Sequence, residues 1–424
     1  MSRASHRVVI SGIGFISPIG NDLETVRNNL RLGRHGLSEI QLWGNPNLPV
    51  RLAGLIQDFD VESTSYRDWS WPAIYDIPRT VARSLPPHGV YAACAVLQAL
   101  KQANLSAPEF EQNDDTGLFC ASAGSARFMH HHVEQMREVA GERGNPLGLV
   151  SSIAGTLNFN LASFFKITGS VCGFVSACAS SSHAAGYAFD EIRLGRLKRA
   201  IVVGAEDVNA ESLLPFLAMR ALSSNHVAEL ASRPFDSARD GFVGAGGAAA
   251  LVLETEEEAR ARGLYPLIEL AGWGQSADGF SVAMPHPDGK GLRLAMKRAL
   301  ADAGESASSV DYVNAHATST IQGDRAEARA LREIFQGQDV PISSTKGLTG
   351  HTLSMAGVLE AALCAVSMQE GFIPGNPHLV NPDPECEGLY LPRETLKIQP
   401  DVVLSNSSGF GGSNVCVALR RLSR

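Results

Sequence analysis

Short runs of apolar and small residues recur along the chain, and segments of helical length separate them. The runs occupy residues 8–11, 169–177, 200–204, 249–253, 267–270, 312–315, 401–405 and 415–419. An unbroken apolar run of this length is typical of a strand that is buried on both faces, and such a strand needs helices over each face of its sheet. The pattern therefore predicts an α/β fold in which strands and helices form layers.

The order of these features repeats. Each half opens with a strand and a glycine-containing turn, carries a middle helix of small residues, and ends with a glycine-rich loop that leads into a strand. The middle helices are expected at residues 178–194 and roughly 352–370, and their Ala, Ser and Gly content suits a position deep in the interior. We therefore expect a duplicated fold with halves at residues 1–263 and 264–424, linked through the charged stretch 256–263.

The composition is that of a globular chain with a large core: 424 residues, 44% of them hydrophobic and 19% charged. The net charge of −8 argues against a nucleic-acid-binding role, which usually needs a basic surface. The chain has no run of about 18 uninterrupted apolar residues, so no transmembrane helix and no membrane role are expected. The apolar start at residues 8–16 is broken by Ser and Gly, so we expect a core strand, no signal peptide and a cytoplasmic protein.

Signals for metals and cofactors are weak. The seven cysteines are scattered and include no CxxC pair, which fits a reducing compartment better than a disulfide framework. His130, His131 and His132 are consecutive and do not share one helix face, so we expect no metal site. Gly12 and Gly14 form a GxG, but the third glycine of a dinucleotide-binding loop is missing, so no cofactor is expected.

Cys178 lies where the run 169–177 meets the small-residue segment 179–186. This junction predicts a buried strand, an abrupt turn and a helix with the thiol on its first turn. A helix N-terminus presents unpaired N–H groups and a partial positive charge, so a thiol there ionises more readily and becomes a nucleophile. The alternative is a buried structural cysteine, because a free thiol also behaves as a small hydrophobic group.

Two histidine motifs lie far from Cys178 in the sequence. His316 follows a predicted strand and precedes the hydroxyl residues Thr318 and Thr320, a position at the carboxyl edge of a sheet where ligands often bind. Lys346 and His351 flank a glycine-bearing turn ahead of an apolar helix. Each residue alone has an ordinary interpretation as a loop histidine, a surface charge or a helix cap.

Taken in order, these features resemble a known family. The order is Cys178, then His-x-Thr-Ser-Thr from His316, then Lys-x-x-x-Gly-His from Lys346, then Gly-Phe-Gly-Gly from Gly409. It resembles the elongating type I and II β-ketoacyl-acyl-carrier-protein synthases of the thiolase superfamily over residues 8–419. The resemblance implies a duplicated thiolase-like fold whose two sheet-containing halves form α-β-α-β-α layers.

The resemblance also implies a decarboxylative Claisen condensation in fatty-acid or related polyketide or polyene synthesis. Cys178 would take an acyl group as a thioester, and His316 and His351 would serve the decarboxylation of malonyl-acyl carrier protein. The resulting enolate would attack the acyl thioester and give a 3-oxoacyl-acyl carrier protein. The N–H groups of Cys178 and Phe410 would form the oxyanion hole, and Lys346 would order the charge network of the catalytic set.

Further roles follow from the same resemblance. Phe410 would be a mobile gate, and Thr318 and Thr320 would bind the pantetheine arm. The implied partner is an acidic acyl carrier protein, so we expect a basic docking surface that includes Arg79 and Arg83. The family implies a homodimer.

The chain departs from the family pattern at two positions. Ala317 stands where a glycine usually follows the first histidine, and Ser408 replaces an aromatic residue beside the gate, which puts the gating in doubt. Glu360 matches a buried glutamate that is expected to be structural.

Two other interpretations remain open. One is a catalytically silent chain-length partner subunit, although such relatives lack the nucleophile. The other is a coenzyme A thiolase, which carries a second catalytic cysteine near its C-terminus. Cys416 lies within a predicted strand, a poor place for a catalytic thiol.

Overall fold

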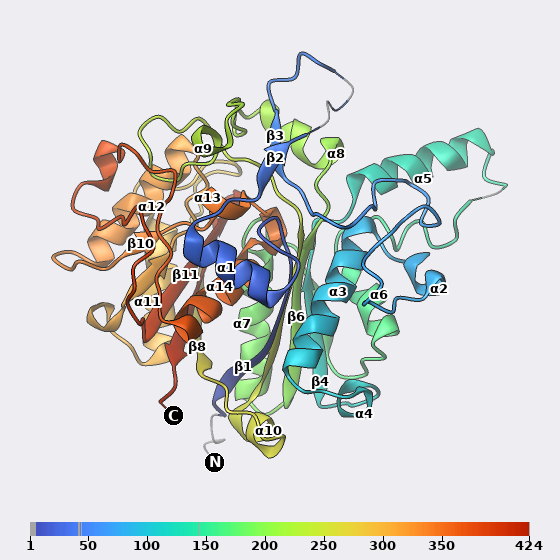
Figure 1. The fold of residues 1–424 in the computed structure, drawn as a ribbon, viewed down its shortest axis with the longest axis horizontal. Coiled ribbons are helices and arrows are strands. Elements are labelled where there is room, and N and C mark those ends of the chain that lie inside the picture. The colour runs from blue at the N-terminus through green and yellow to red at the C-terminus, as the bar shows by residue number, and fades with distance from the viewer. Residues whose placement is uncertain (1–5, 41–42, 44, 143, 424) are drawn as a thin grey trace.

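The computed structural model describes residues 6–40, 43, 45–142 and 144–423, and its main feature is a ten-stranded sheet (Figure 1). The strands lie in the order β10-β9-β11-β12-β8-β1-β7-β6-β4-β5. Five come from the first part of the chain: β1 (Val8–Ile16), β4 (Thr116–Ala121), β5 (Val171–Phe174), β6 (Arg199–Glu206) and β7 (Gly247–Thr255). Five come from the second part: β8 (Ile268–Ala277), β9 (Tyr312–Asn314), β10 (Ile342–Ser343), β11 (Val402–Gly409) and β12 (Ser413–Arg421). A separate hairpin pairs β2 (Leu37–Glu39) with β3 (Leu52–Gly54).

The two sets of five strands have the same topology. When the strands of each set are numbered one to five along the chain, they lie side by side in the order 3-2-4-5-1. This order is β5-β4-β6-β7-β1 in the first set and β10-β9-β11-β12-β8 in the second. In both sets the second strand runs parallel to the third and the fourth, and the fifth runs antiparallel to the fourth and the first. The sets meet between β1 and β8, where one pair of residues, Val9 and Glu269, is in register. The repeated features of the sequence therefore correspond to a repeated strand order.

Helices form layers around the two sets of strands. Figure 1 shows α7 (Ser180–Arg193) and α14 (Ala356–Glu370) near the centre of the molecule, where they share one hydrophobic core with residues of both strand sets. On the outer faces, α3 (Pro87–Gln102) packs on the first set, and α11 (Lys290–Ala303) and α12 (Ile321–Ile334) pack on the second. The α/β class and the layered arrangement expected from the sequence are confirmed.

The remaining helices are peripheral or short. They are α1 (Leu23–Leu32), α2 (Arg79–Ala82), α4 (Ala107–Phe110), α5 (Ala126–Glu138), α6 (Leu157–Phe164), α8 (Ala210–Leu213), α9 (Ala228–Ala231), α10 (Glu256–Ala261) and α13 (Lys346–Thr349). Single 3₁₀ turns include η3 (Leu353–Met355), which leads into α14, and η5 (Phe410–Gly412), which joins β11 to β12. Among the described helices, none has the length and apolar content needed to span a bilayer.

Small residues let the two central helices approach closely. A Cβ added at Gly357 of α14 would lie 1.9 Å from Oγ of Ser182 on α7. Because protein interiors are close-packed, a larger side chain at this contact would push the helices apart. The Ala, Ser and Gly content of both helices therefore follows from their central position.

Two expectations about local structure need correction. The run 169–177 was expected to be a buried strand, but β5 ends the strand order and is partly exposed. In that run, 37% of Val171 in the strand and 65% of Val175 just beyond it are accessible. The sequence pattern of an edge strand with apolar residues resembles that of an inner strand. The central helix also begins at Ser180, so Cys178 precedes its first turn rather than lying within it.

Candidate active site

Cys178 lies in a tight turn between β5 and α7. Ala177 immediately before it has a φ of +51°, in the left-handed region that non-glycine residues seldom adopt. The turn is held locally, because the Ser176 N–H donates to Oγ of Ser180 at 2.8 Å and the Ser180 N–H donates to the Ala177 carbonyl at 3.1 Å. The strained backbone directs the thiol into a cavity at the N-terminal end of α7.

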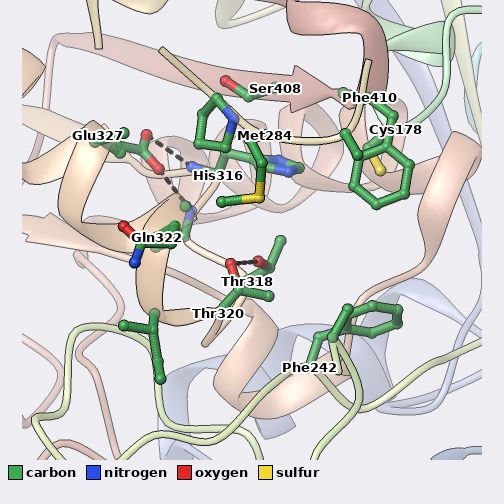
Figure 2. Close-up of a pocket in the computed structure, with 18 of the residues that line it drawn as sticks. Cys178, Phe242, Met284, His316, Thr318, Thr320, Gln322, Glu327, Ser408 and Phe410 are labelled. Atoms are coloured by element: carbon green, nitrogen blue, oxygen red, sulfur yellow. Dashed lines mark hydrogen bonds between the residues drawn. The ribbon is translucent and has the colours of Figure 1, made fainter. Parts of the chain in front are cut away.

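His316 is positioned from behind by α12. It follows β9, and its backbone N–H and that of Ala317 donate to the two carboxylate oxygens of Glu327 at 3.0 and 2.7 Å (Figure 2). Asn406 of β11 donates to the same carboxylate at 3.0 Å. Glu327 therefore fixes the loop that carries the histidine, and Ala317 fits beside this carboxylate with 1% of its surface exposed.

His351 approaches the thiol from a different loop. Its backbone is tied on both sides, since its N–H donates to the Val243 carbonyl at 2.7 Å and its carbonyl accepts from the Ala245 N–H at 2.9 Å. Its Nε2 lies 3.1 Å from Sγ of Cys178. The His316 and His351 ring centroids are 5.3 Å apart and the rings are nearly perpendicular, at 84°. Ligand-type atoms of Cys178, His316 and His351 all lie within 4.8 Å of one another, so three distant motifs meet at one point.

Lys346 is a buried charge. Only 1% of its side chain is exposed, and Nζ contacts a carboxylate oxygen of Glu360 on α14. The surface-charge interpretation of this lysine is therefore wrong. Losing either partner would leave an uncompensated buried charge, which costs about 3–5 kcal/mol.

Burial makes both imidazole rings neutral. It lowers the pKa of His316 and of His351 well below the usual value, and the nearby positive charge of Lys346 lowers both further. Nδ1 of each ring is buried and has no hydrogen-bond partner among the described residues. Because no such bond fixes the tautomer, either nitrogen can carry the proton.

The thiol behaves differently from the sequence-based expectation. Burial raises the pKa of Cys178 to about 12, and the nearby Lys346 charge opposes this rise without cancelling it. What remains accessible of Cys178 faces the cavity. The thiol is therefore protonated at neutral pH, and Nε2 of His351 is the adjacent acceptor for its proton.

A cavity of about 340 Å³ extends from Cys178 to the surface. Thr318 and Thr320 line it and their hydroxyls are 3.0 Å apart (Figure 2). Phe410 also lines it, is 41% exposed, and lies 5.8 Å from the Phe216 ring, centroid to centroid. Aromatic contacts continue from Phe216 through Phe242 to His351, each pair 5.3 Å apart.

Glycine allows the Phe410 loop to approach the nucleophile. A Cβ at Gly409 would lie 2.8 Å from the Ser176 carbonyl oxygen and 3.0 Å from the backbone nitrogen of Cys178. Ser408, in place of the aromatic residue of the family pattern, donates from Oγ to Asn414 Oδ1 at 2.7 Å. Asn414 in turn donates to Asp278 at 2.8 Å, so Ser408 links this loop to the segment after β8.

The two arginines expected to dock a carrier do not line the cavity. Both are exposed; Arg79 lies over the Trp71 ring at 4.5 Å and donates to the Trp69 carbonyl at 2.7 Å. Sequence reasoning missed Arg220, which is exposed, lines the cavity and has no ion-pair partner among the described residues.

Comparisons with known proteins agree with this geometry. Residues 5–259 match the model of the beta-ketoacyl synthase N-terminal domain, and residues 267–380 match that of the C-terminal domain. The chain is 35% identical to 3-oxoacyl-[acyl-carrier-protein] synthase 1 of Escherichia coli (strain K12), over 98% of this chain and 99% of that protein.

Solved structures show the same likeness. A crystal structure of a beta-ketoacyl synthase from Burkholderia phymatum STM815 superimposes with a TM-score of 0.90 at 33% identity, covering 99% of this chain and all of that one. A type II polyketide synthase ketosynthase, solved with its acyl carrier protein and bound to the hexaketide, gives 0.86 at 26% identity and covers 99% of this chain and 100% of that chain.

The fold is that of the thiolase-like condensing enzymes. Within that class, the chain belongs to the beta-ketoacyl synthase family.

The raised pKa of Cys178 can be tested by alkylation. With iodoacetamide, we expect slow modification of Cys178 at pH 7 and a rate that keeps rising with pH up to about pH 10, because the thiolate is the reactive form. Peptide mass spectrometry would follow Cys178, with free glutathione as the reference thiol. A rate for Cys178 that levels off below about pH 8 would instead mean that the helix N-terminus outweighs burial.

Proposed function

We propose that this protein condenses an acyl thioester with malonyl-acyl carrier protein, with loss of CO2, to give a 3-oxoacyl-acyl carrier protein. The observation that carries this proposal is the convergence of one thiol and two neutral imidazoles, with Sγ of Cys178 3.1 Å from Nε2 of His351. The names of the most similar relatives support the same reaction.

In the first half-reaction, Cys178 attacks the carbonyl carbon of the incoming acyl thioester. The thiol proton passes to Nε2 of His351 and then to the departing pantetheine sulfur, while a new thioester forms at Sγ. N–H groups of Cys178 and Phe410 form the oxyanion hole, supported by the close approach of Gly409 to the Cys178 backbone. Such a donor is worth roughly 3–4 kcal/mol in the transition state.

In the second half-reaction, malonyl carrier protein loses its carboxylate as CO2. The electron pair of the broken C–C bond forms an enolate, whose oxygen accepts hydrogen bonds from neutral His316 and His351. The enolate carbon then attacks the acyl carbon on Cys178. The C–S bond breaks, and the released thiolate takes a proton to regenerate the thiol. The low pKa of both rings supports donation without permanent positive charge.

Lys346 acts as a positioning residue. Its charge keeps the two rings neutral, and Glu360 holds it in place. Phe410 acts as the gate between the cavity and the thiol, supported by its exposure and by the glycines on either side. The condensation as written needs no cofactor.

The pantetheine arm enters along Thr318 and Thr320. The hydroxyls of both threonines line the cavity between the surface and the histidines, which suits hydrogen bonds to the amides of the arm. Arg220 at the same cavity suits the phosphate of the arm, because a guanidinium binds phosphate oxygens through paired N–H groups. An acidic carrier would contact Arg79 and Arg83 farther out.

The two alternative functions have less support. A silent chain-length partner would not need a nucleophile paired with His351. A thiolase would need a second cysteine at the site, but Cys416 lies within β12 with no exposed surface and does not line the cavity. Acylation of Cys178 by an acyl donor would argue against a silent partner, and malonyl decarboxylation by the purified protein would argue against a thiolase.

We further propose that the chain consists of duplicated halves at residues 1–263 and 264–424 and acts in the cytoplasm. The repeated strand order and the single register pair between β1 and β8 support the division. Use of carrier-bound thioesters and seven free cysteines support a reducing compartment.

We also propose a homodimer that forms through β5. One edge of this strand has no strand partner among the described residues, and exposed apolar side chains surround it: Phe159, Val171, Val175 and Tyr187. Unpaired edges with apolar residues promote association, and a two-fold axis would let β5 pair with its own copy.

Two variants distinguish the role of the Cys178 thiol in acylation from the role of the imidazole rings in decarboxylation. We expect His316→Ala to abolish release of CO2 from malonyl carrier while leaving Cys178 acylation intact. Cys178→Ala should still release CO2 slowly, but should form no acyl-enzyme. Mass spectrometry of the protein and a CO2 assay would measure both steps. Retained condensation in His316→Ala, or no residual CO2 in Cys178→Ala, would contradict the assignment.

Charge reversals test the carrier contacts. We expect Arg220→Glu to raise the KM for carrier-bound substrates roughly tenfold or more, equivalent to about 1.4 kcal/mol, with a smaller rise for Arg79→Glu and Arg83→Glu. Steady-state kinetics with carrier-bound substrates would measure this. Arg260→Glu on α10 is the matched control and should leave KM unchanged. Equal KM values for Arg220→Glu and the control would contradict the proposed contact between Arg220 and the phosphate of the arm.

The β5 edge can be tested by sedimentation velocity. We expect the unmodified protein to sediment as a dimer and Val171→Lys to shift it toward monomer, because a lysine on an edge strand disfavours pairing. Tyr265→Lys, at an apolar residue that is 75% exposed and follows α10, is the control. A dimer that survives Val171→Lys, or a monomeric unmodified protein, would count against this interface.

A further inference from the structure

The arrangement of Cys178, His316 and His351 has the features of a zinc-binding site. One sulfur and two imidazole nitrogens, from three separate loops, lie within 4.8 Å of one another. The histidines are buried, with 8% and 3% of their surfaces exposed, and their ring planes are nearly perpendicular. Thiolate and imidazole are the ligands that Zn²⁺ prefers.

The distances are close to those of tetrahedral coordination. With Zn–S near 2.3 Å and Zn–N near 2.0–2.1 Å, neighbouring ligand atoms are separated by roughly 3.3–3.6 Å. The Sγ–Nε2 distance is 3.1 Å, and all the ligand atoms lie within 4.8 Å of one another. Changes of at most about 1.5 Å in the separation of two ligand atoms would therefore reach these values. The cavity next to Cys178 leaves the fourth position open to water. No carboxylate belongs to the set, which disfavours Mg²⁺ and Ca²⁺.

The surroundings limit the affinity. The positive charge of Lys346 opposes a second cation nearby, and the carboxylates of Glu360 and Glu327 offset it. Nδ1 of each ring lacks an acceptor among the described residues, whereas metal-binding histidines usually donate that N–H, and loss of such a partner costs about 10–100-fold in affinity. The site therefore suits reversible binding rather than a permanent structural ion.

We propose that Cys178, His316 and His351 together bind Zn²⁺ or a similar thiophilic divalent cation, and that this binding reversibly inactivates the protein. The ion forms bonds to Sγ and to one nitrogen of each ring, and the thiol proton is released to solvent. The bound sulfur can no longer attack a thioester, and the rings can no longer donate to an enolate. The inactivation rests on the proposed function, whereas the binding at these three side chains does not depend on the condensation reaction.

Cobalt titration provides the test, since Co²⁺ reports a thiolate ligand by a charge-transfer band in the near-ultraviolet. We expect one Co²⁺ per chain with this band, displaced by Zn²⁺. Cys178→Ser should remove the band, and His316→Ala and His351→Ala should each weaken binding at least tenfold. Cys386→Ser, at a cysteine that does not line the cavity, is the matched control and should change nothing. A band that survives in Cys178→Ser, or disappears in Cys386→Ser, would overturn the proposal.

A second measurement needs no variant. Zn²⁺ should slow iodoacetamide modification of Cys178 in the unmodified protein at least tenfold, and a chelator should restore the rate. Mg²⁺ at the same concentration should have no effect. Unchanged modification of Cys178 in Zn²⁺ would mean that any bound ion lies elsewhere, for example on His130–His132, and would refute the proposed site. If the protein without added metal failed to condense malonyl thioesters, that result would count against the proposed function and would leave the metal site untouched.

Discussion

The close packing of α7 against α14 is the constraint on which the site depends. Cys178 directly precedes α7, and His351 precedes the turn that leads into α14, so the separation of these helices sets the distance between thiol and imidazole. Gly357 against Ser182 brings the helices together without a side chain between them. Because the helices also fill the layer between the two strand sets, the same contact serves the core and the chemistry.

Charge is organised around this contact so that the reacting groups stay neutral. The charged members, Lys346 and Glu360, lie behind the rings and neutralise each other. Both carboxylate oxygens of Glu327 accept hydrogen bonds, from two backbone N–H groups and from the side-chain amide of Asn406. Glu327 therefore orients His316 rather than accepting a proton from it. The thiol and the rings are left as neutral donors and acceptors in a buried site, where hydrogen bonds are stronger than in water.

Much of the architecture could be predicted from the sequence because it depends on patterns that are local. Buried strands such as β6 and β7 are continuous apolar runs, and the small-residue content of α7 and α14 indicates a crowded position. The position of β5 at the sheet edge could not be predicted, because its residues are as apolar as those of an inner strand. The order of strands, rather than composition, decides which strand is left without a neighbour.

The sequence predicted which residues form the site, but not how burial changes the pKa values of their side chains. The motifs around Cys178, His316 and His351 point to those side chains, whereas their meeting requires the tertiary fold. The raised pKa of Cys178 was not predictable, since the helix effect can be inferred from a sequence and the degree of burial cannot. Arg220 was missed because an isolated arginine carries no pattern until the cavity beside it is known.

The exposed edge of β5 has a consequence for the nucleophile itself. Cys178 is only four residues beyond the last residue of this strand, and the open edge of the strand has no strand partner among the described residues. Such edges open more easily than inner strands, so the order of the turn at Ala177 depends on what covers the edge. If the proposed pairing of β5 with its own copy covers this edge, the catalytic output of each chain should fall on dilution, even though Cys178, His316 and His351 belong to that same chain.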